Sequence, residues 1–373
     1  MQRGLGQPSR LNSLTSLRFF AATLVVLYHS LPLWKHYVIT YRLLQFGYLG
    51  VTFFFILSGF VLTYSSLSSP LNGKKFVLNR IARIWPLHIA TLIVCIVGSS
   101  LCHAPIAGIP GTSFFGTSLN FVLLHAWIPL NPNIRQGWNG VSWTLSVEFM
   151  FYLAFPFMFR SLKRQTTKQL ISLSVFLWVL YAIFTEVARS TGNYSLMDIL
   201  WYFPPSRFPE FITGCVMAII LHRGIKIHRW NFARVLGLLL LPGSILIYAS
   251  VTSAHTRFQA EANMIVIPAF AIIIWASACK DVIQNNAGML ARNRTILTLG
   301  QESFALYLLH APLLGLFGYT LFLNHSLNNS ACGGEILTVI YFLAALGLSR
   351  LVHALYELPV ESRLRSIIKK RYG

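Results

Sequence analysis

Residues 43–64 read LLQFGYLGVTFFFILSGFVLTY and contain no charged side chain. About 20 consecutive apolar residues let a helix cross the hydrocarbon core of a bilayer. Ten other stretches have the same apolar character, and some of them are shorter: residues 19–33, 84–101, 114–130, 141–159, 170–188, 208–221, 235–251, 264–279, 299–323 and 336–355. The sequence therefore predicts an all-α fold, a polytopic transmembrane helix bundle that forms a single domain over residues 1–373.

The composition also indicates that the lipid bilayer is the main environment of the chain. Hydrophobic residues make up 55% of the 373 positions and charged residues only 11%, which lies far outside the usual range of soluble domains. The formal net charge of +20 would indicate a nucleic-acid partner if it were collected on one face of a soluble domain. Here the basic residues lie between apolar stretches, so the charge reports membrane topology and no nucleic-acid partner is expected.

The positions of Lys and Arg predict how the chain crosses the membrane. Basic residues concentrate in alternate connections, and only six of the 30 lie elsewhere, at positions 35, 42, 135, 189, 207 and 257. Because Lys and Arg prefer the cytoplasmic side, both termini are expected in the cytoplasm, with the protein in a bacterial inner membrane. This pattern requires about ten spanning helices. Residues 114–130 are expected to form a re-entrant segment instead, because Gly116, His125 and Pro129 interrupt them.

Arg18 and His29 lie on the first apolar helix with ten residues between them. A rise of 1.5 Å per residue places His29 roughly 16 Å deeper than Arg18, so the arginine is expected at the inner rim and the histidine near mid-membrane. A polar side chain at that depth is costly, which makes a functional site facing the bundle interior the default interpretation. The alternative is a structural histidine bonded to a backbone carbonyl.

Glu148 and His310 are expected at the same depth as His29. Glu148 lies about 10 Å below the outer rim if its helix begins near residue 141, and His310 lies eleven residues into a helix that starts inside. A His29/Glu148 pair would reduce the cost of burying both groups and raise the basicity of the imidazole. A purely structural ion pair is the alternative for Glu148, and His310 fits a scaffold role as well as a site role.

Arg80 and Arg83 lie three residues apart on one face of a helix at its inner end. With Arg18 they could form a positively charged entrance that binds a phosphorylated ligand, because planar guanidinium groups match phosphate geometry. Taken alone, such a pair is more often only a marker of topology. The five cysteines have no C-x-x-C pair and no zinc-ligand spacing, so no metal site is predicted.

An ordered set of motifs resembles those of the bacterial acyltransferase family 3 membrane proteins, which O-acylate surface glycans and related acceptors. The resemblance covers most of the chain. It rests on LTSLRFFAA at residues 14–22 with His29 beyond it, FFFILSGF at 53–60, NRIARIWP at 79–86, SWTLSVEFMFY at 142–152, SFALYLLH at 303–310 and YELP at 356–359.

The resemblance implies a cytoplasmic acyl-CoA, expected to be acetyl-CoA, as co-substrate, with no permanently bound cofactor. It implies that the Arg18/His29 pair is central to activity and that Arg80-x-x-Arg83 belongs to the donor site. Ser142 and Trp143 are expected to support the substrate. Larger members carry an extracytoplasmic SGNH-type domain, and none is expected within this polypeptide.

These observations predict an enzyme that moves an acyl group from acyl-CoA to a hydroxyl of an extracytoplasmic glycan or a lipid-linked saccharide. His29 would act as general base, oriented by Glu148, or would carry the acyl group as a covalent intermediate. The sequence does not separate these two mechanisms. The rival hypothesis is a transporter or lipid-linked-sugar flippase, in which buried His and Glu side chains would relay protons.

Overall fold

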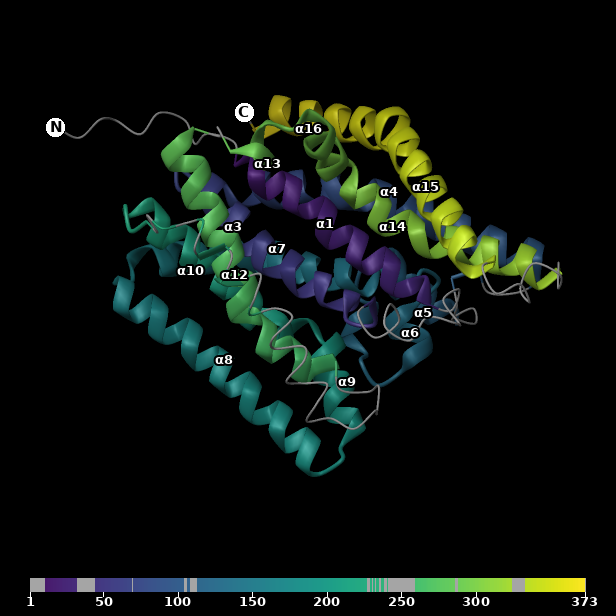
Figure 1. The fold of residues 1–373 in the computed structure, drawn as a ribbon, viewed down its shortest axis with the longest axis horizontal. Helices are drawn as coiled ribbons and strands as arrows, with labels where there is room; N and C mark the ends of the chain where they lie inside the picture. The colour runs from purple at the N-terminus through teal and green to yellow at the C-terminus, as the bar shows by residue number, and fades with distance from the viewer. Residues whose placement is uncertain are drawn as a thin grey trace. The chain divides into compact units, whose positions relative to one another are not determined.

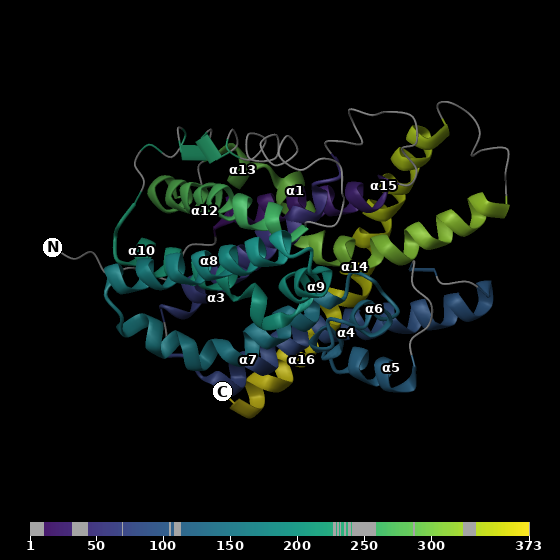
Figure 2. The same ribbon diagram turned by 90° about the horizontal axis from the view of Figure 1, so that it is seen from below.

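The computed structural model describes residues 11–31, 44–68, 70–103, 106–107, 113–226, isolated positions from 229 to 240, 259–285, 288–323 and 333–372. The described residues are helical and contain no strand, so the all-α prediction is confirmed (Figures 1 and 2). The helices are α1 (Asn12–His29), α3 (Gly50–Ser66), α4 (Gly73–Cys102), α5 (Phe114–Phe121), α6 (Pro132–Gln136), α7 (Trp143–Arg164), α8 (Thr167–Ser190), α9 (Tyr194–Tyr202), α10 (Phe208–His222), α12 (Gln259–Gln284), α13 (Met289–Arg292), α14 (Arg294–Leu323), α15 (Gly333–Val352) and α16 (Leu358–Tyr372).

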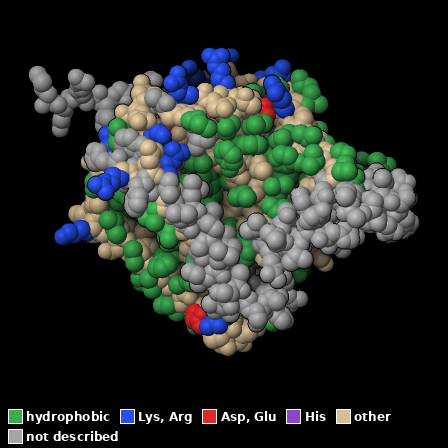
Figure 3. Space-filling view, in the orientation of Figure 1, with side chains coloured by type: hydrophobic (Ala, Val, Ile, Leu, Met, Phe, Trp, Pro, Cys, Tyr) green, Lys and Arg blue, Asp and Glu red, His purple; other side chains and the backbone are tan. Residues whose placement is uncertain are grey.

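Six segments of the described chain are long and apolar enough to cross a bilayer: Gly47–Ser66, Gly73–Cys102, Trp143–Arg164, Thr167–Ser190, Ala262–Gln284 and Ile336–Tyr372. Hydrophobic side chains cover wide areas of the face drawn in Figure 3, as expected where lipid is the solvent. The predicted span at residues 235–251 lies almost entirely outside the described residues. The count of about ten spans, the cytoplasmic termini and the inner-membrane location stay predictions.

The interrupted stretch at residues 114–130 does not form one long helix. Helix α5 covers only eight residues, or about 12 Å at 1.5 Å per residue, which is far less than the thickness of a bilayer core. Leu123 then takes a positive φ of 60°, and a short turn of 3₁₀ helix follows at His125–Trp127. The predicted interruption is confirmed, while the re-entrant path through a membrane stays a prediction.

Contacts between residues divide the chain into two compact units, and several helices have residues in both units. Unit 1 consists of residues 1–18, 51–72 and 153–301, and unit 2 consists of residues 19–50, 73–152 and 302–373. Whether they act as the single domain expected from the sequence stays a prediction.

Unit 1 is held by close helix crossings. Helix α10 packs against α8 and α12, and it also meets α3 at two glycines. A Cβ added to Gly59 would overlap the backbone carbonyl of Phe211, and one added to Gly214 would overlap the carbonyl of Ile56. Small residues let helix backbones approach closely where lipid provides no hydrophobic drive for association.

In unit 2, α16 runs along α4, and the two helices lie side by side in both ribbon views (Figures 1 and 2). A short π-helical turn, His353–Glu357, joins α15 to α16. The hydroxyl of Tyr356 in this turn donates to the carbonyl of Pro86 at 3.1 Å. The turn thus brings two glutamates, Glu357 and Glu361, to Arg83 of α4.

Candidate active site

Two histidines meet in unit 2. His29 is the last residue of α1, and His310 lies in the middle of α14. His310 Nε2 lies 3.3 Å from His29 Nδ1, and the ring centroids are 5.0 Å apart. His310 is fully buried. The depth argument from the sequence predicted that the two rings share a layer, and the structure brings them into direct contact.

The hydrogen bond of His29 to the backbone assigns its tautomer. His29 Nδ1 lies 2.9 Å from the carbonyl oxygen of Val25, and a carbonyl oxygen can only accept, so Nδ1 carries the proton. In the neutral ring, Nε2 then has the free lone pair and can take a proton from a substrate. The structural alternative, a histidine bonded to a carbonyl, is therefore present, and it leaves the other nitrogen for chemistry.

A layer of hydroxyl groups fixes His310 in place. The Tyr341 hydroxyl donates to the carbonyl of His310 at 3.0 Å. The ring of Tyr307 packs against the His310 ring with centroids 5.8 Å apart, and its hydroxyl lies 3.1 Å from the Val141 carbonyl and 2.9 Å from Thr144 Oγ1. These bonds join α14 to the start of α7.

The other predicted residues of α7 lie in the same unit. Glu148 Oε2 accepts a hydrogen bond from the Tyr152 hydroxyl at 2.8 Å. That His29 is oriented by Glu148 stays a prediction. The rings beside His29 are those of His310 and Tyr28. Trp143 is buried at the first turn of α7. Ser142, just before it, places its Oγ 3.3 Å from His125 Nε2.

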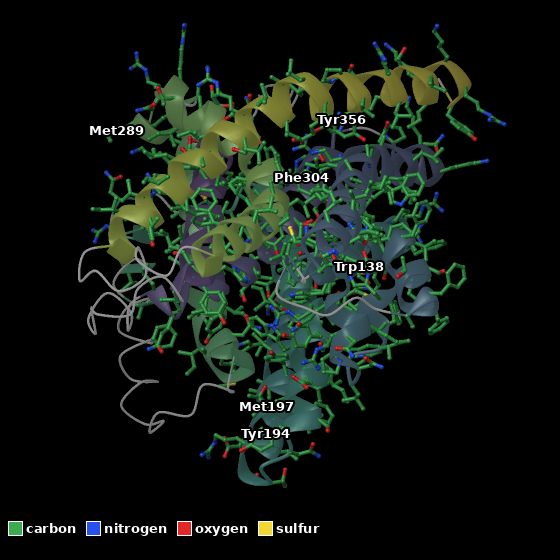
Figure 4. All side chains as sticks on the ribbon, turned by 90° about the vertical axis from the view of Figure 1, so that its right-hand side faces the viewer. Trp138, Tyr194, Met197, Met289, Phe304 and Tyr356 are labelled. Carbon is green, nitrogen blue, oxygen red and sulfur yellow. The ribbon has the colours of Figure 1, made fainter. Side chains whose placement is uncertain are left out.

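Arg80 and Arg83 have very different surroundings on α4. Arg83 Nη1 lies 2.9 Å from Glu357 Oε1 and 2.6 Å from Glu361 Oε2, and its guanidinium lies over the ring of Phe304, labelled in Figure 4. Arg80 lies over the ring of Phe76 instead, and its buried Nε has no hydrogen-bond partner among the described residues. Arg83 is thus neutralised by carboxylates from the π-helical turn and α16, whereas Arg80 has no such carboxylate partner among the described residues.

Arg18 lies eleven residues before His29 on the continuous helix α1. Its side chain is only partly buried. The donor site expected jointly from Arg18, Arg80 and Arg83 stays a prediction. Among the described residues, no group of three or more His, Cys, Asp and Glu side chains is arranged to hold a metal ion.

Unit 1 contains a buried ion pair that sequence reasoning missed. Arg207 Nη2 lies 2.9 Å from Glu210 Oε1, and both side chains are fully buried. Asn263 donates to the same oxygen at 2.8 Å, and the guanidinium lies over the rings of Trp201 and Phe55. The sequence does contain a signal for this pair, an Arg and a Glu three residues apart at the start of an apolar stretch. That stretch begins at residue 208, however, so the sequence places Arg207 in the preceding connection. The pair joins the start of α10 to α9, α3 and α12.

Residues 11–354 match the model of a family described as an acyltransferase domain, and the chain belongs to this family of membrane acyltransferases. It is similar to the acyltransferase MdmB of Streptomyces mycarofaciens, with 30% identity over 94% of this chain and 91% of the relative. It is also similar to the peptidoglycan O-acetyltransferase OatA of Listeria monocytogenes, with 23% identity over 82% of this chain, and to the putative peptidoglycan O-acetyltransferase YrhL of Bacillus subtilis, with 24% identity over 81%.

This chain spans about half the length of the two peptidoglycan O-acetyltransferases, 49% and 48%. No solved structure matches it. The resemblance found in the motifs is therefore confirmed at the level of the family, and the acyl donor, the acceptor and the roles of single residues are matters for proposal.

Proposed function

We propose that this protein is a membrane O-acyltransferase that moves an acyl group, expected to be acetyl, from cytoplasmic acyl-CoA to a hydroxyl of an extracytoplasmic or lipid-linked saccharide. The observation that carries the proposal is the His29/His310 contact in a chain of an acyltransferase family. It provides one imidazole with a defined tautomer and a second, buried imidazole beside it.

In the proposed reaction, His29 Nε2 removes the proton of the acceptor hydroxyl as its oxygen attacks the thioester carbonyl. The new carbon–oxygen bond forms, the carbon–sulfur bond breaks, and the departing thiolate takes the proton from the imidazolium. His29 carries a positive charge in between. Its Nδ1–H donates to the Val25 carbonyl, which stabilises that charge. His310 Nε2, 3.3 Å from the same nitrogen, adds to this stabilisation in the tautomer that carries its proton on Nδ1.

Glu148 keeps its predicted role as the carboxylate that orients His29, and the contact with His310 supports a second residue for the same task. An acyl-His29 intermediate is the alternative mechanism. There the acyl group would cross to the outer side on the imidazole before the acceptor binds. Rapid denaturation near neutral pH during turnover with labelled acetyl-CoA separates the two, because only the second mechanism leaves label on the protein and an acyl imidazole would hydrolyse quickly in acid.

For the donor, we propose that Arg80 contacts a phosphate group of acyl-CoA. Two observations support this assignment. Arg80 Nε has no hydrogen-bond partner, and Arg80 forms no ion pair among the described residues. Arg18 and Arg83 belong to the proposed donor site because the motif resemblance implies it, and the charge of Arg83 is offset there by Glu357 and Glu361. A bound CoA at this end of α4 would exchange its hydration for charge-assisted hydrogen bonds.

The direct test measures transfer of labelled acetyl from acetyl-CoA to glycan in membranes that contain the protein. His29→Gln is expected to lower the rate by about 10²- to 10⁴-fold, the usual range for loss of a general base. His310→Gln is expected to lower the turnover number by about tenfold or more with the KM for acetyl-CoA unchanged. Tyr341→Phe is the matched control, because it removes only the bond to the His310 carbonyl.

Undiminished transfer by a folded His29→Gln protein would remove His29 from the mechanism. If wild-type protein instead moves a labelled saccharide across the membrane without consuming acetyl-CoA, the transporter or flippase hypothesis is correct.

A further inference from the structure

A second group of buried polar side chains lies in unit 2, apart from the two histidines of the candidate active site. His88 comes from α4, Asn120 from α5, His125 from the 3₁₀ turn and Ser142 from the residue before α7. All four side chains have an exposed fraction of 0%. We call these four residues the His88 cluster.

The two imidazoles of the cluster face each other. The rings of His88 and His125 are nearly parallel, with an interplanar angle of 3° and centroids 6.4 Å apart. His88 Nε2 donates to the backbone carbonyl of Asn120 at 2.9 Å. Because a carbonyl only accepts, the proton of a neutral His88 is on Nε2 and its Nδ1 is a bare acceptor.

Several atoms of the cluster have no hydrogen-bond partner among the described residues. These are His88 Nδ1, His125 Nδ1 and both polar atoms of the Asn120 amide. Buried amides without partners are rare, and each one calls for an explanation such as an absent ligand or water. Gly137 helps to keep the amide in place: at its φ of +59°, a Cβ would overlap Asn120 Nδ2, so only glycine leaves room for this side chain.

The cluster is connected to the active-site histidines by the segment 137–142 in the same unit. Asn139 Nδ2 donates to the carbonyl of Leu308 at 2.9 Å. Val141, the neighbour of Ser142, accepts from the Tyr307 hydroxyl, and the Tyr307 ring packs against His310. Bonds from the residues just before Ser142 therefore link the His88 cluster to the part of α14 that carries His310.

The chemistry of the cluster selects a neutral ligand rich in hydroxyl groups. An imidazole acceptor beside an amide that both donates and accepts can satisfy a hydroxyl group, which itself both donates and accepts. No member of the cluster carries a full charge, so the phosphates of CoA have no cation to bind here. Trp138, labelled in Figure 4, lies in the segment 137–142 and is held by a hydrogen bond from Nε1 to Thr117 Oγ1.

We propose that the His88 cluster is the acceptor subsite, where Asn120 and His88 bind hydroxyl groups of a saccharide and so hold the reacting hydroxyl for His29. This inference rests on the proposed function, and it adds the residues that recognise the acceptor. These residues position the substrate and take no proton from it.

The test uses the full-length protein in lipid nanodiscs, with labelled acetyl-CoA as donor and a titrated extract of lipid-linked saccharides from the host membrane as acceptor. Two rates are measured: acetyl transfer to the extract, and release of CoA without acceptor. Asn120→Ala and His88→Gln are the variants, and Ser277→Ala is the control because Ser277 is also buried with an unpartnered hydroxyl, but lies in unit 1.

Asn120→Ala and His88→Gln are each expected to raise the half-saturating amount of acceptor about tenfold, the effect of one lost hydrogen bond. The KM for acetyl-CoA and the acceptor-free release of CoA are expected to stay unchanged, as is every parameter of Ser277→Ala.

An unchanged half-saturating amount in both variants, or an equal loss of transfer and of CoA release, would show that the cluster is structural and overturn the inference. His88→Gln keeps a donor near the Asn120 carbonyl, so it retains the fold if Asn120→Ala does not. Failure of the wild-type protein to use acetyl-CoA at all would instead refute the proposed function on which the inference rests.

Discussion

At the level of single residues, two arginines of one sequence motif make different contacts. Arg83 is held between Glu357 and Glu361, while Arg80 lies over the ring of Phe76. Within this motif, Arg83 therefore holds α16 against α4. Arg80 has an Nε donor without a partner among the described residues. The spacing of the two arginines puts both of them on one face of α4. It does not predict which of them pairs with the glutamates.

This difference predicts opposite outcomes for two matched substitutions. Arg83→Gln is expected to lower the stability of the purified protein by about 1–3 kcal/mol, because Glu357 and Glu361 each lose one partner. Glu357 keeps His353 and Glu361 keeps Arg365. Arg80→Gln is expected to leave the melting temperature close to wild type and to raise the KM for acetyl-CoA about tenfold, the effect of losing a charge-assisted hydrogen bond.

The double variant Arg83→Gln/Glu361→Gln is the control for the first substitution, since removing one carboxylate should recover part of the lost stability. Equal KM values for Arg80→Gln and wild type would exclude Arg80 from the donor site.

At the level of helices, the crossing of α3 and α10 depends on two glycines. Gly214 lies against the carbonyl of Ile56, and Gly59 lies against that of Phe211. A methyl group at either position must push the helices apart, because backbone atoms cannot move aside as the end of a flexible side chain can.

Gly214→Ala is therefore expected to destabilise the protein by about 1–3 kcal/mol, the usual cost of overpacking. Gly347→Ala on α15 is the matched control. Nothing lies within 4 Å of a Cβ there, so the better helix propensity of alanine should leave stability equal or slightly higher. Thermal unfolding in detergent, followed by size-exclusion chromatography, measures both. A Gly214→Ala protein as stable as Gly347→Ala would show that this crossing can relax.

For the whole molecule, the open question is how many helices cross the membrane. Six described helices qualify by length and apolar composition, while the basic connections predict about ten spans with residues 114–130 re-entrant. The short α5 agrees with a segment that does not cross. The Lys and Arg bias sets which connections stay in the cytoplasm.

A reporter fused after Arg160 is expected to show a cytoplasmic location, and one fused after Pro132 an extracytoplasmic one. Alkaline phosphatase, active only outside, and green fluorescent protein, fluorescent only inside, give independent signals at each position. An extracytoplasmic signal after Arg160 would mean that residues 114–130 span the membrane, and the predicted orientation of the helices that follow would be reversed.

The sequence alone determined the class of fold, the family and most of the candidate residues. Long apolar stretches cannot remain in water, and in lipid their backbone must satisfy its hydrogen bonds internally, so helices follow from composition without any tertiary information. That residues 114–130 do not form one long helix was predictable from Pro129, but the place of the break was not: α5 runs through Gly116 and ends at Phe121, and Leu123 beyond it takes a positive φ. Family motifs then pointed to His29 and Arg80.

Only the tertiary structure decided which polar groups are partners. His29 meets His310 across 281 positions of sequence, Arg83 meets Glu361 across 278, and the unpartnered amide of Asn120 lies beside His88. Periodicity gives the depth and face of a residue on its own helix, but the rotation and neighbour of each helix depend on packing summed over the whole bundle. Depth could be predicted, and pairing could not.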